Sequence, residues 1–362
     1  MRSSIARNVR RFRVMKGLNQ GGLAEKAGIS RNAYRSIETG SSEPRTDNLE
    51  RIAKALDVSV LDLVREVPEL TSLRFRSRKS LTAQQRALQE DLVTRFALWL
   101  SDFKGLEEML EIKSIQSPSG RPNASPEEQA THVRETLGVG EASPIIDITD
   151  LLEEAGIKLH LAPVRLDSFF GMSVSEADHG PAMSINTART IPVERRIFST
   201  AHELGHLIMH RDSYDGSDRV EDPNEEKEAD QFAGYFLMPG PAFGQIWNEI
   251  RGLHFVDRVM KVKRYFQVSY RTVLVRLIEM GKLDNSIWRD FHGYYKRHVG
   301  RSLSHNKEPF PLAEPDFEED KLDHLVRNAL EKEIISLDRA AEILGLGLDD
   351  MRERVRSWEV AR

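Results

Sequence analysis

The chain has 362 residues, of which 40% are hydrophobic and 30% charged, a composition that indicates a globular protein and excludes a fibre or bulk disorder. It contains no cysteine, so disulfides, thiolate metal sites and cysteine-based redox control within the chain are excluded. No apolar run approaches bilayer length, and the first residues carry charge where a secretory signal needs an apolar stretch. We therefore expect a cytoplasmic protein.

Charge is distributed unevenly along the chain. The formal net charge is −5, yet residues 1–65 hold 13 Lys and Arg against 7 Asp and Glu. This segment therefore carries about +6 and the remainder about −11. The asymmetry predicts a nucleic-acid-binding module at the front of the chain.

Residues 4–65 have the pattern of five short helices joined by tight turns. Three glycines mark breaks between them: Gly17, Gly28 and Gly40. Residues 20–27 and 30–39 are expected to form a helix-turn-helix, with Ser30 as the N-cap of its second helix.

In that second helix, Tyr34 and Ile37 are expected to face a small core. Their expected neighbours are Leu23, Ala24, Ile52 and Leu56. Four polar side chains remain on the outer face: Arg31, Asn32, Arg35 and Ser36. Arginine reads guanine and asparagine reads adenine through paired hydrogen bonds, so these residue types suit base edges.

Four stretches of this segment together resemble the Cro/cI-type (XRE) DNA-binding domain: Gly17-Leu-Asn-Gln20, Leu23-Ala-Glu-Lys-Ala-Gly-Ile-Ser30, Ile37-Glu-Thr-Gly40 and Leu49-Glu-Arg-Ile-Ala-Lys-Ala-Leu56. The resemblance implies contacts with double-stranded operator DNA at Gln20, Arg31, Asn32 and Ser36. It also implies an internal ion pair between Arg13 and Glu38. The alternative is that the helix-turn-helix mediates homodimer formation or docks another protein, but the basic charge favours phosphate contact.

A connector follows. Residues 66–80 end in the basic cluster Arg74-Phe-Arg76-Ser-Arg78-Lys79, which we interpret as a solvated hinge rather than a site for a single-stranded DNA effector, because only Phe75 interleaves the charges. Residues 81–112 show a long amphipathic helical pattern, and residues 117–126 are a breaker-rich linker. The expected domain limits are 1–66, 67–126, 127–300 and 301–362.

The next segment combines helices with a small sheet. Helical patterns at residues 127–137 and 148–154 precede three strand candidates, at residues 157–161, 169–173 and 182–185.

The run Ala201-His202-Glu203-Leu204-Gly205-His206 carries the clearest chemical signal. Apolar residues at helical spacing surround it, so His202 and His206 are expected to project from one helix face, one turn apart. Two imidazoles so placed can hold one Zn²⁺, and Glu203, beside the open side of the metal, can take a proton from water there. These residues are typical of a zinc hydrolase, and the zinc needs a third protein ligand.

Residues 225–239 supply a candidate for that ligand. Their apolar positions recur at helical spacing, so Glu226 can bind zinc while Asp230, one turn further, accepts a hydrogen bond from the non-ligating nitrogen of a histidine. From the residues alone a second interpretation stays open, in which Glu226 is one surface acid of a charged cluster.

Together with His-Glu-Leu-Gly-His, the stretches Ala229-Asp-Gln-Phe-Ala233 and Leu237-Met-Pro239 resemble the ImmA/IrrE family of zinc metallopeptidases, of the gluzincin group. The resemblance places the third ligand at Glu226. It implies a helix, small sheet and zinc helix in that order, with an edge strand that pairs with an extended substrate, which we assign to residues 182–186. The chain is thus expected to be mainly α, with an α+β catalytic domain.

Two further residues near the expected site have weaker signals. Tyr214, between the ligand helices, is a candidate donor to the oxyanion, although an ordinary loop tyrosine is the simpler interpretation. His210, one turn beyond His206, is expected to be turned away from the metal and to be structural or exposed.

The remainder of the chain has a helical pattern. Residues 262–280 are expected to pack under the metal site, and the polar, Pro-rich residues 305–318 to form a second linker. Residues 322–358 are expected to form two or three helices, one of them capped by Ser336 and ended by Gly345. We interpret them as a packing or dimerisation cap rather than half of another helix-turn-helix.

Members of the resembled peptidase family cut Cro/cI-type repressors and so derepress stress, mobile-element or phage-response genes. The resemblance therefore implies a DNA-binding regulator with a zinc endopeptidase domain, whose substrate is such a repressor or the chain itself. The alternative is a non-catalytic XRE-type transcription factor or antitoxin whose peptidase fold serves as a sensor or interaction domain. Glu203 favours the first, because a binding-only zinc site needs no base there.

Overall fold

The computed structural model describes residues 4–75, 82–166, 169–214, 222–304, 307–314 and 317–360. Its contacts divide the chain into two compact units. The N-terminal unit comprises residues 1–69 and 77–101, and the C-terminal unit comprises residues 70–76 and 102–362.

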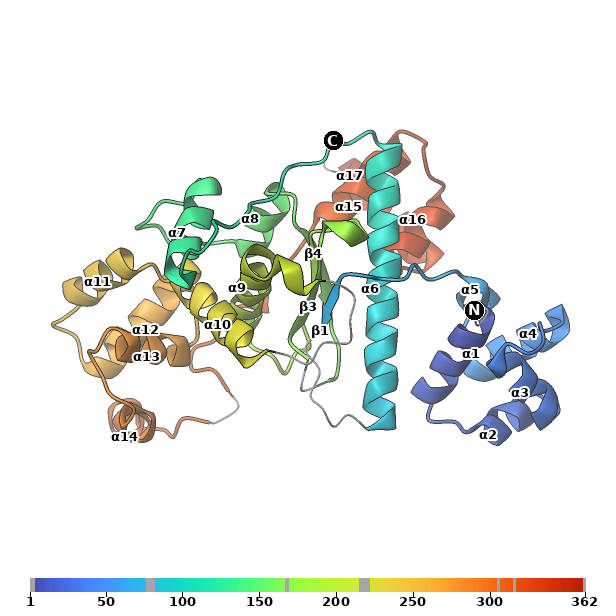
Figure 1. Ribbon diagram of the computed structural model, residues 1–362, viewed down its shortest axis with the longest axis horizontal. Helices are drawn as coiled ribbons and strands as arrows, with labels where there is room; N and C mark the ends of the chain where they lie inside the picture. Colours follow the sequence, from blue (N-terminus) through green and yellow to red (C-terminus); the bar gives the residue numbers. More distant parts are fainter. Residues whose placement is uncertain are drawn as a thin grey trace. The chain divides into compact units, whose positions relative to one another are not determined.

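The N-terminal unit contains the five expected helices. They are α1 (Ser4–Met15), α2 (Gln20–Lys26), α3 (Arg31–Thr39), α4 (Thr46–Leu56) and α5 (Val60–Val64) (Figure 1). Ser30 caps α3 by accepting a hydrogen bond from the backbone N–H of Ala33, and Gly40 ends α3 with a φ of 71°, which favours glycine. Tyr34 and Ile37 are buried with the expected partners, so the predicted core is confirmed.

Inside this unit, Glu38 joins α1 to α3. The guanidinium of Arg13 donates two hydrogen bonds to the Glu38 carboxylate, at 2.8 and 2.7 Å, and the Tyr34 hydroxyl donates a third at 2.5 Å. The predicted Arg13–Glu38 ion pair is therefore present. It satisfies a carboxylate that burial would otherwise destabilise.

The helices expected between residues 81 and 154 are also present. The long α6 (Ala83–Met109) contributes residues to both units. In the C-terminal unit, α7 (Pro126–Thr136) begins at a capping box formed by Ser125 and Glu128, and α8 (Ile148–Glu154) begins at Asp147.

A four-stranded sheet forms the centre of the C-terminal unit. Its strands are β1 (Leu73–Phe75), β2 (Lys158–Ala162), β3 (Gly171–Val174) and β4 (Ala182–Asn186), in the spatial order β1-β3-β4-β2. Strand β3 is antiparallel to β1 and β4, whereas β2 is parallel to β4. The assignment of residues 182–186 to the sheet edge was wrong, because β4 is paired on both sides.

The interpretation of the basic connector as a solvated hinge was also wrong for residues 73–75, which form β1. The Arg74 side chain is only 15% exposed and makes ion pairs with Glu225 and Glu226, while the ring of Phe75 stacks on Phe169 at 5.3 Å. Carboxylates distant in sequence thus draw this arginine inward. Arg76, Arg78 and Lys79 lie outside the described residues.

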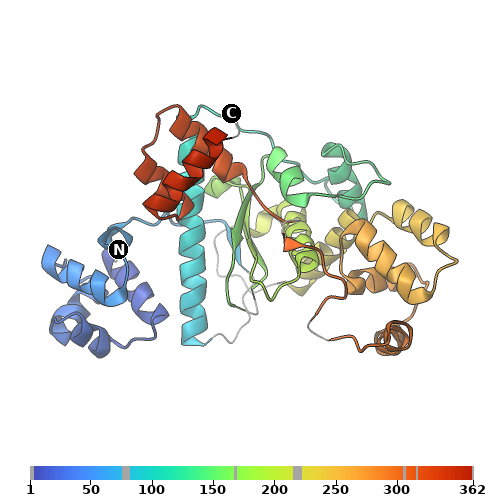
Figure 2. The same ribbon diagram turned by 180° about the vertical axis from the view of Figure 1, so that it is seen from behind.

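One helix packs on a face of the sheet, and a second helix packs beside the first. In the two views, α9 (Val193–Met209) lies against β3 and β4, with α10 (Pro223–Leu237) beside it (Figures 1 and 2). Their apolar faces meet in the main core, where Leu204 and Phe232 are fully buried. After α10 the chain continues with four helices: α11 (Gly240–Glu249), α12 (Phe255–Phe266), α13 (Tyr270–Glu279) and α14 (Ile287–Val299). Residues 262–280, expected as one helical stretch, are split between α12 and α13.

Residues 307–314 are the described part of the second expected linker. They run beside α9 and α12 in the C-terminal unit (Figure 2). The carboxylate of Glu194, in α9, accepts hydrogen bonds from Lys263 and from the backbone N–H of Leu312, while Arg196 pairs with Glu314. Residues 307–314 are therefore packed against α9, the helix that carries His202 and His206. Beyond it, the expected helical tail is present as α15 (Lys321–Glu331), α16 (Leu337–Leu344) and α17 (Leu348–Val360).

Across the described ranges of the chain, no helix is both long enough and apolar enough to cross a bilayer.

Candidate metal centre

Helix geometry brings the predicted ligands together. His202 and His206 project from the same face of α9, with their Nε2 atoms 3.0 Å apart. Glu226, in the first turn of α10, reaches the same point, with its carboxylate oxygens 3.5 Å from His202 Nε2 and 3.3 Å from His206 Nε2. Both histidines are buried, and the Glu226 side chain is 14% exposed.

The other ring nitrogens are held by partners further out. His202 Nδ1 lies 2.8 Å from the carboxylate of Asp230, as expected from the sequence. His206 Nδ1 lies 2.8 Å from Nδ1 of His210, whose Nε2 is 3.0 Å from Glu228. When each inner ring is neutral and protonated at Nδ1, its Nε2 lone pair is directed at the common point.

Of the two expectations for His210, structural or exposed, the structure supports the first, because His210 is buried and bonded at both nitrogens. Its role as the outer partner of His206 was missed. A histidine four residues after His206, directly at the end of the predicted helix, was the available signal.

The donor set fits Zn²⁺. Ligand atoms placed tetrahedrally with bonds of about 2.0–2.2 Å lie about 3.3–3.6 Å from one another, close to the separations found between the three side chains. Two histidines and one carboxylate leave the fourth position of such a site open. A histidine that binds zinc usually donates its other ring N–H to a partner, and Asp230 and His210 provide such partners for His202 and His206.

Electrostatics within the cluster also favour a cation. Burial lowers the pKa of His206 to about 3, so this ring is neutral and its Nε2 lone pair is available. Burial opposes the charged form of His202 as well, but hydrogen bonds with Asp230 and Glu226 outweigh it and raise the pKa to about 9. The pKa of Glu226 lies far below its usual range, because the two histidines outweigh the effect of burial.

Glu203 lies between the cluster and β3. One carboxylate oxygen accepts a hydrogen bond from the Ser173 hydroxyl at 2.7 Å, and burial raises the pKa of this carboxyl group. A Cβ at Gly171 would lie 2.8 Å from Glu203 Oε1 and 2.9 Å from its Cγ, so a larger residue there would displace the Glu203 side chain. The Tyr214 hydroxyl lies 2.8 Å from Ser173 Oγ, so Ser173 links it to Glu203.

An arginine that the sequence did not single out completes the surroundings. The Arg74 guanidinium donates hydrogen bonds to Glu225 at 2.6 Å and to Glu226 at 3.2 Å. The candidate ligand is thus also bound to a residue of β1, about 150 positions earlier in the chain. Nothing local in the sequence indicates this pairing.

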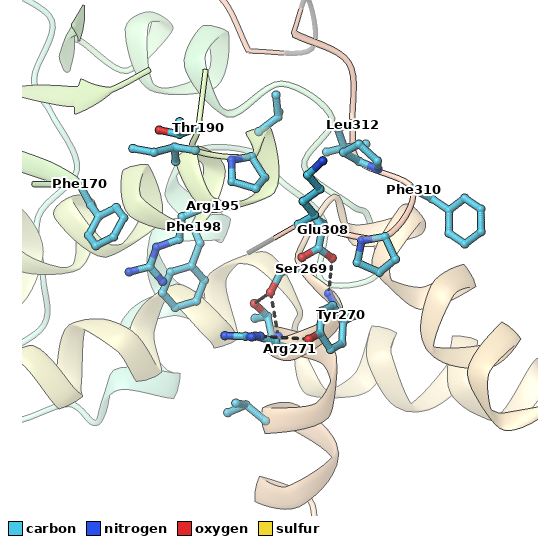
Figure 3. Close-up of a pocket in the computed structure, with 18 of the residues that line it drawn as sticks. Phe170, Thr190, Arg195, Phe198, Ser269, Tyr270, Arg271, Glu308, Phe310 and Leu312 are labelled. Atoms are coloured by element: carbon cyan, nitrogen blue, oxygen red, sulfur yellow. Dashed lines mark hydrogen bonds between the residues drawn. The ribbon is translucent and has the colours of Figure 1, made fainter. Parts of the chain in front are cut away.

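Beside the cluster is an open pocket of about 1780 Å³. Its lining shares Phe170, Arg195 and Phe198 with a small hollow that reaches His202 and Glu203. Figure 3 shows these three side chains together on one side, with Glu308 and Tyr270 across the pocket. The pocket gives an extended ligand room to approach the cluster.

A second group of possible ligands consists of His254, Asp257 and His298, all exposed. The rings of His254 and His298 stack in parallel, with centroids 3.8 Å apart and planes 4° apart. Their in-plane lone pairs therefore do not converge on one point, and we assign no metal site there.

The predicted DNA-contacting residues lie in and beside α3. Arg31, Asn32 and Arg35 are exposed, and Ser36 is half-buried. Gln20, at the start of α2, is also half-buried, and its amide donates a hydrogen bond to Glu38 at 3.1 Å. The polar face of α3 is thus free of the core.

Comparison with known proteins agrees with both units. A family model described as the IrrE N-terminal-like domain, of peptidase family M78, matches residues 152–278, and a helix-turn-helix model matches residues 9–63. An uncharacterized HTH-type transcriptional regulator, YqaE, of Bacillus subtilis (strain 168) is 43% identical over 53 residues, which are 15% of this chain and 46% of the relative. The cryptic phage CTXphi transcriptional repressor RstR of Vibrio cholerae is 33% identical over 82 residues, 22% of this chain and 74% of the relative.

The five-helix N-terminal unit and these matches define a protein that combines a helix-turn-helix domain with a domain of a peptidase family. More specifically, residues 9–63 form a helix-turn-helix domain of the XRE type, and residues 152–278 match the IrrE N-terminal-like domain of a peptidase family. It spans about half the length of the first relative.

Proposed function

We propose that the C-terminal unit is a zinc-dependent endopeptidase and that the N-terminal unit binds double-stranded operator DNA. The observation that supports the peptidase most directly is the convergence of His202, His206 and Glu226 on one point, with the Glu203 carboxylate beside it. A bound Zn²⁺ would lower the pKa of water and polarise a peptide carbonyl.

The roles of the chain's own residues follow from their positions. Glu203 takes a proton from the attacking water and later delivers it to the leaving amine, while Ser173 holds the carboxylate by its hydrogen bond. Asp230 and His210 fix the orientation of the two ligand histidines. Tyr214 remains a candidate donor to the oxyanion, although its hydroxyl is engaged with Ser173.

The substrate we propose is a repressor of the Cro/cI type, or the chain itself. The support is that the N-terminal unit is of the same kind as such repressors, so that related DNA-binding domains can meet on one operator or in one dimer. The competing function is a regulator in which the peptidase fold only senses or binds. Glu203 in contact with both β3 and the cluster argues for catalysis, because a binding site needs no such base.

The deciding variant for the peptidase is Glu203→Gln, which keeps the shape of the side chain. We expect it to bind one zinc per chain, as the wild type does, but to cleave a Cro/cI-type repressor about 10²–10⁴-fold more slowly. Zinc content by metal analysis and cleavage by mass spectrometry measure the two properties. Equal cleavage by both proteins would exclude Glu203 as the base, and absence of zinc from the folded wild type would favour the non-catalytic regulator.

Operator binding is tested by Arg31→Ala with Lys54→Ala as the control. Both remove one exposed positive charge from the N-terminal unit, but Lys54 lies on α4. We expect Arg31→Ala to lose about 1–3 kcal/mol of preference for the operator over unrelated DNA, and Lys54→Ala to keep it. Titrations by fluorescence anisotropy at several salt concentrations measure this, and equal effects of both variants would remove Arg31 from base recognition.

A further inference from the structure

Strand β3 is the part of the sheet that contacts the proposed base. Ser173 donates a hydrogen bond to Glu203, and Gly171 lies directly against it. One side of β3 is paired with β4, so a peptide can join the sheet next to the metal centre only along the other side. Adding a strand to such an edge is a general way to bind an extended peptide.

That other side of β3 is taken by β1. Leu73, Arg74 and Phe75 pair antiparallel with Val174, Ser173 and Met172. Arg74, opposite Ser173, is also the residue whose side chain reaches Glu226. The strand therefore occupies both the backbone edge and one carboxylate of the candidate metal centre.

We propose that the β1-facing edge of β3 is the binding surface for the extended backbone of the substrate, and that β1 is an internal strand that occludes it. This inference rests on the proposed peptidase function. The residues that match the peptidase family begin only at 152, so β1 lies outside the matched range. Because β1 is part of the same chain, its effective concentration at the edge is in the millimolar range, and a substrate must compete with it.

The contacts of β1 suit a strand that opens from one end. Before it, Asp178 accepts hydrogen bonds from the backbone and hydroxyl groups of both Thr71 and Ser72, at 2.6 to 3.0 Å. The strand itself has only three residues, all half-buried. Release of Phe75 from Phe169 and of Arg74 from its carboxylates would free the edge while Thr71 and Ser72 stay anchored.

Opening can be measured without any substrate. We expect the amides of β1 to exchange hydrogen at least roughly 100-fold faster than those of the central strand β4 under native conditions, because β1 opens locally. Mass spectrometry of the zinc-loaded full chain gives both rates. Equal protection of the two strands would show that β1 is a permanent part of the sheet and would overturn the proposal.

Occlusion is tested by a reversible lock. The chain has no cysteine, so Leu73→Cys together with Val174→Cys places one pair directly opposite across β1 and β3. We expect the oxidised protein to lose at least roughly tenfold in cleavage of a Cro/cI-type repressor, and a phosphine reductant to restore it. Unchanged cleavage in the locked form would overturn the proposal.

Loosening the strand should have the opposite effect. Phe75→Ala removes the stack on Phe169 and should raise the cleavage rate several-fold, whereas Trp288→Ala, at an exposed aromatic residue of the same unit, should not. A slower or unchanged rate with full zinc content would contradict occlusion. If neither the wild type nor Phe75→Ala cleaves the repressor, the proposed peptidase function fails, and hydrogen exchange still decides whether β1 opens.

Discussion

At the scale of single residues, the candidate centre depends on groups that never touch the common point. A histidine can bind a metal through either nitrogen, and the partner of the other nitrogen decides which one is used. Asp230 does this for His202 and His210 does it for His206. His210 in turn is oriented by Glu228, whose side chain is half exposed. The chain of contacts from His206 therefore ends at the surface.

Replacing His210 tests this arrangement. We expect His210→Ala to weaken zinc binding by about 10–100-fold, because the ring of His206 loses the acceptor that fixes its tautomer. Glu228→Gln should have a smaller effect, since it keeps a hydrogen-bonding group at an exposed position. Competition with a chromophoric chelator measures the affinities. Equal zinc affinity of His210→Ala and the wild type would show that His210 only fills space.

At the scale of elements, the sequence identified what depends on local patterns. Helical periodicity and caps located α3 and α9, spacing along one helix placed His202 and His206 on one face, and the family resemblance indicated Glu226. It did not identify β1, because three residues are too few to show alternation and their pairing partner lies about 100 positions away. The central place of β4 was missed for the same reason: strand order is set by long-range packing that no local pattern encodes.

The junction between α8 and the C-terminal helices offers a test of buried charge. Glu153, in α8, is 6% exposed, and burial together with the nearby Glu319 and Asp320 raises its pKa to about 8. The folded protein thus holds this proton more tightly than the unfolded chain. Its stabilising contribution is complete at a pH below about 4.5 and is lost as the pH rises through about 8.

We therefore expect Glu153→Gln to stabilise the protein at pH 8.5, by about 1–2 kcal/mol after allowance for relaxation of the site, and to change little at pH 5. The exposed neighbour Glu154 provides the control, because Glu154→Gln removes the same charge from the same helix. Urea unfolding at the two pH values measures the difference. A stabilisation that is equal at pH 5 and pH 8.5 would contradict the raised pKa.

At the scale of the whole molecule, the two units contain different chemistry. The N-terminal unit has its own core around Tyr34 and carries the face of α3 that we propose for DNA binding, while the cluster of His202, His206 and Glu226 belongs entirely to the C-terminal unit. Zinc would join α9 to α10, which already share the main core. A ligand that binds only the folded form of one unit stabilises only that unit, unless the units unfold together.

Calorimetry of the full chain should therefore show two unfolding transitions, of which only one depends on zinc. At a free zinc concentration about 1,000 times the dissociation constant, the C-terminal unit gains about 4 kcal/mol, enough to raise its unfolding temperature by several degrees. Glu226→Ala should remove most of this gain and leave the other transition unchanged. If zinc shifts both transitions equally, the units unfold as one. If it shifts neither in the wild type, the cluster of His202, His206 and Glu226 is not a zinc site, and the peptidase mechanism proposed for it fails as well.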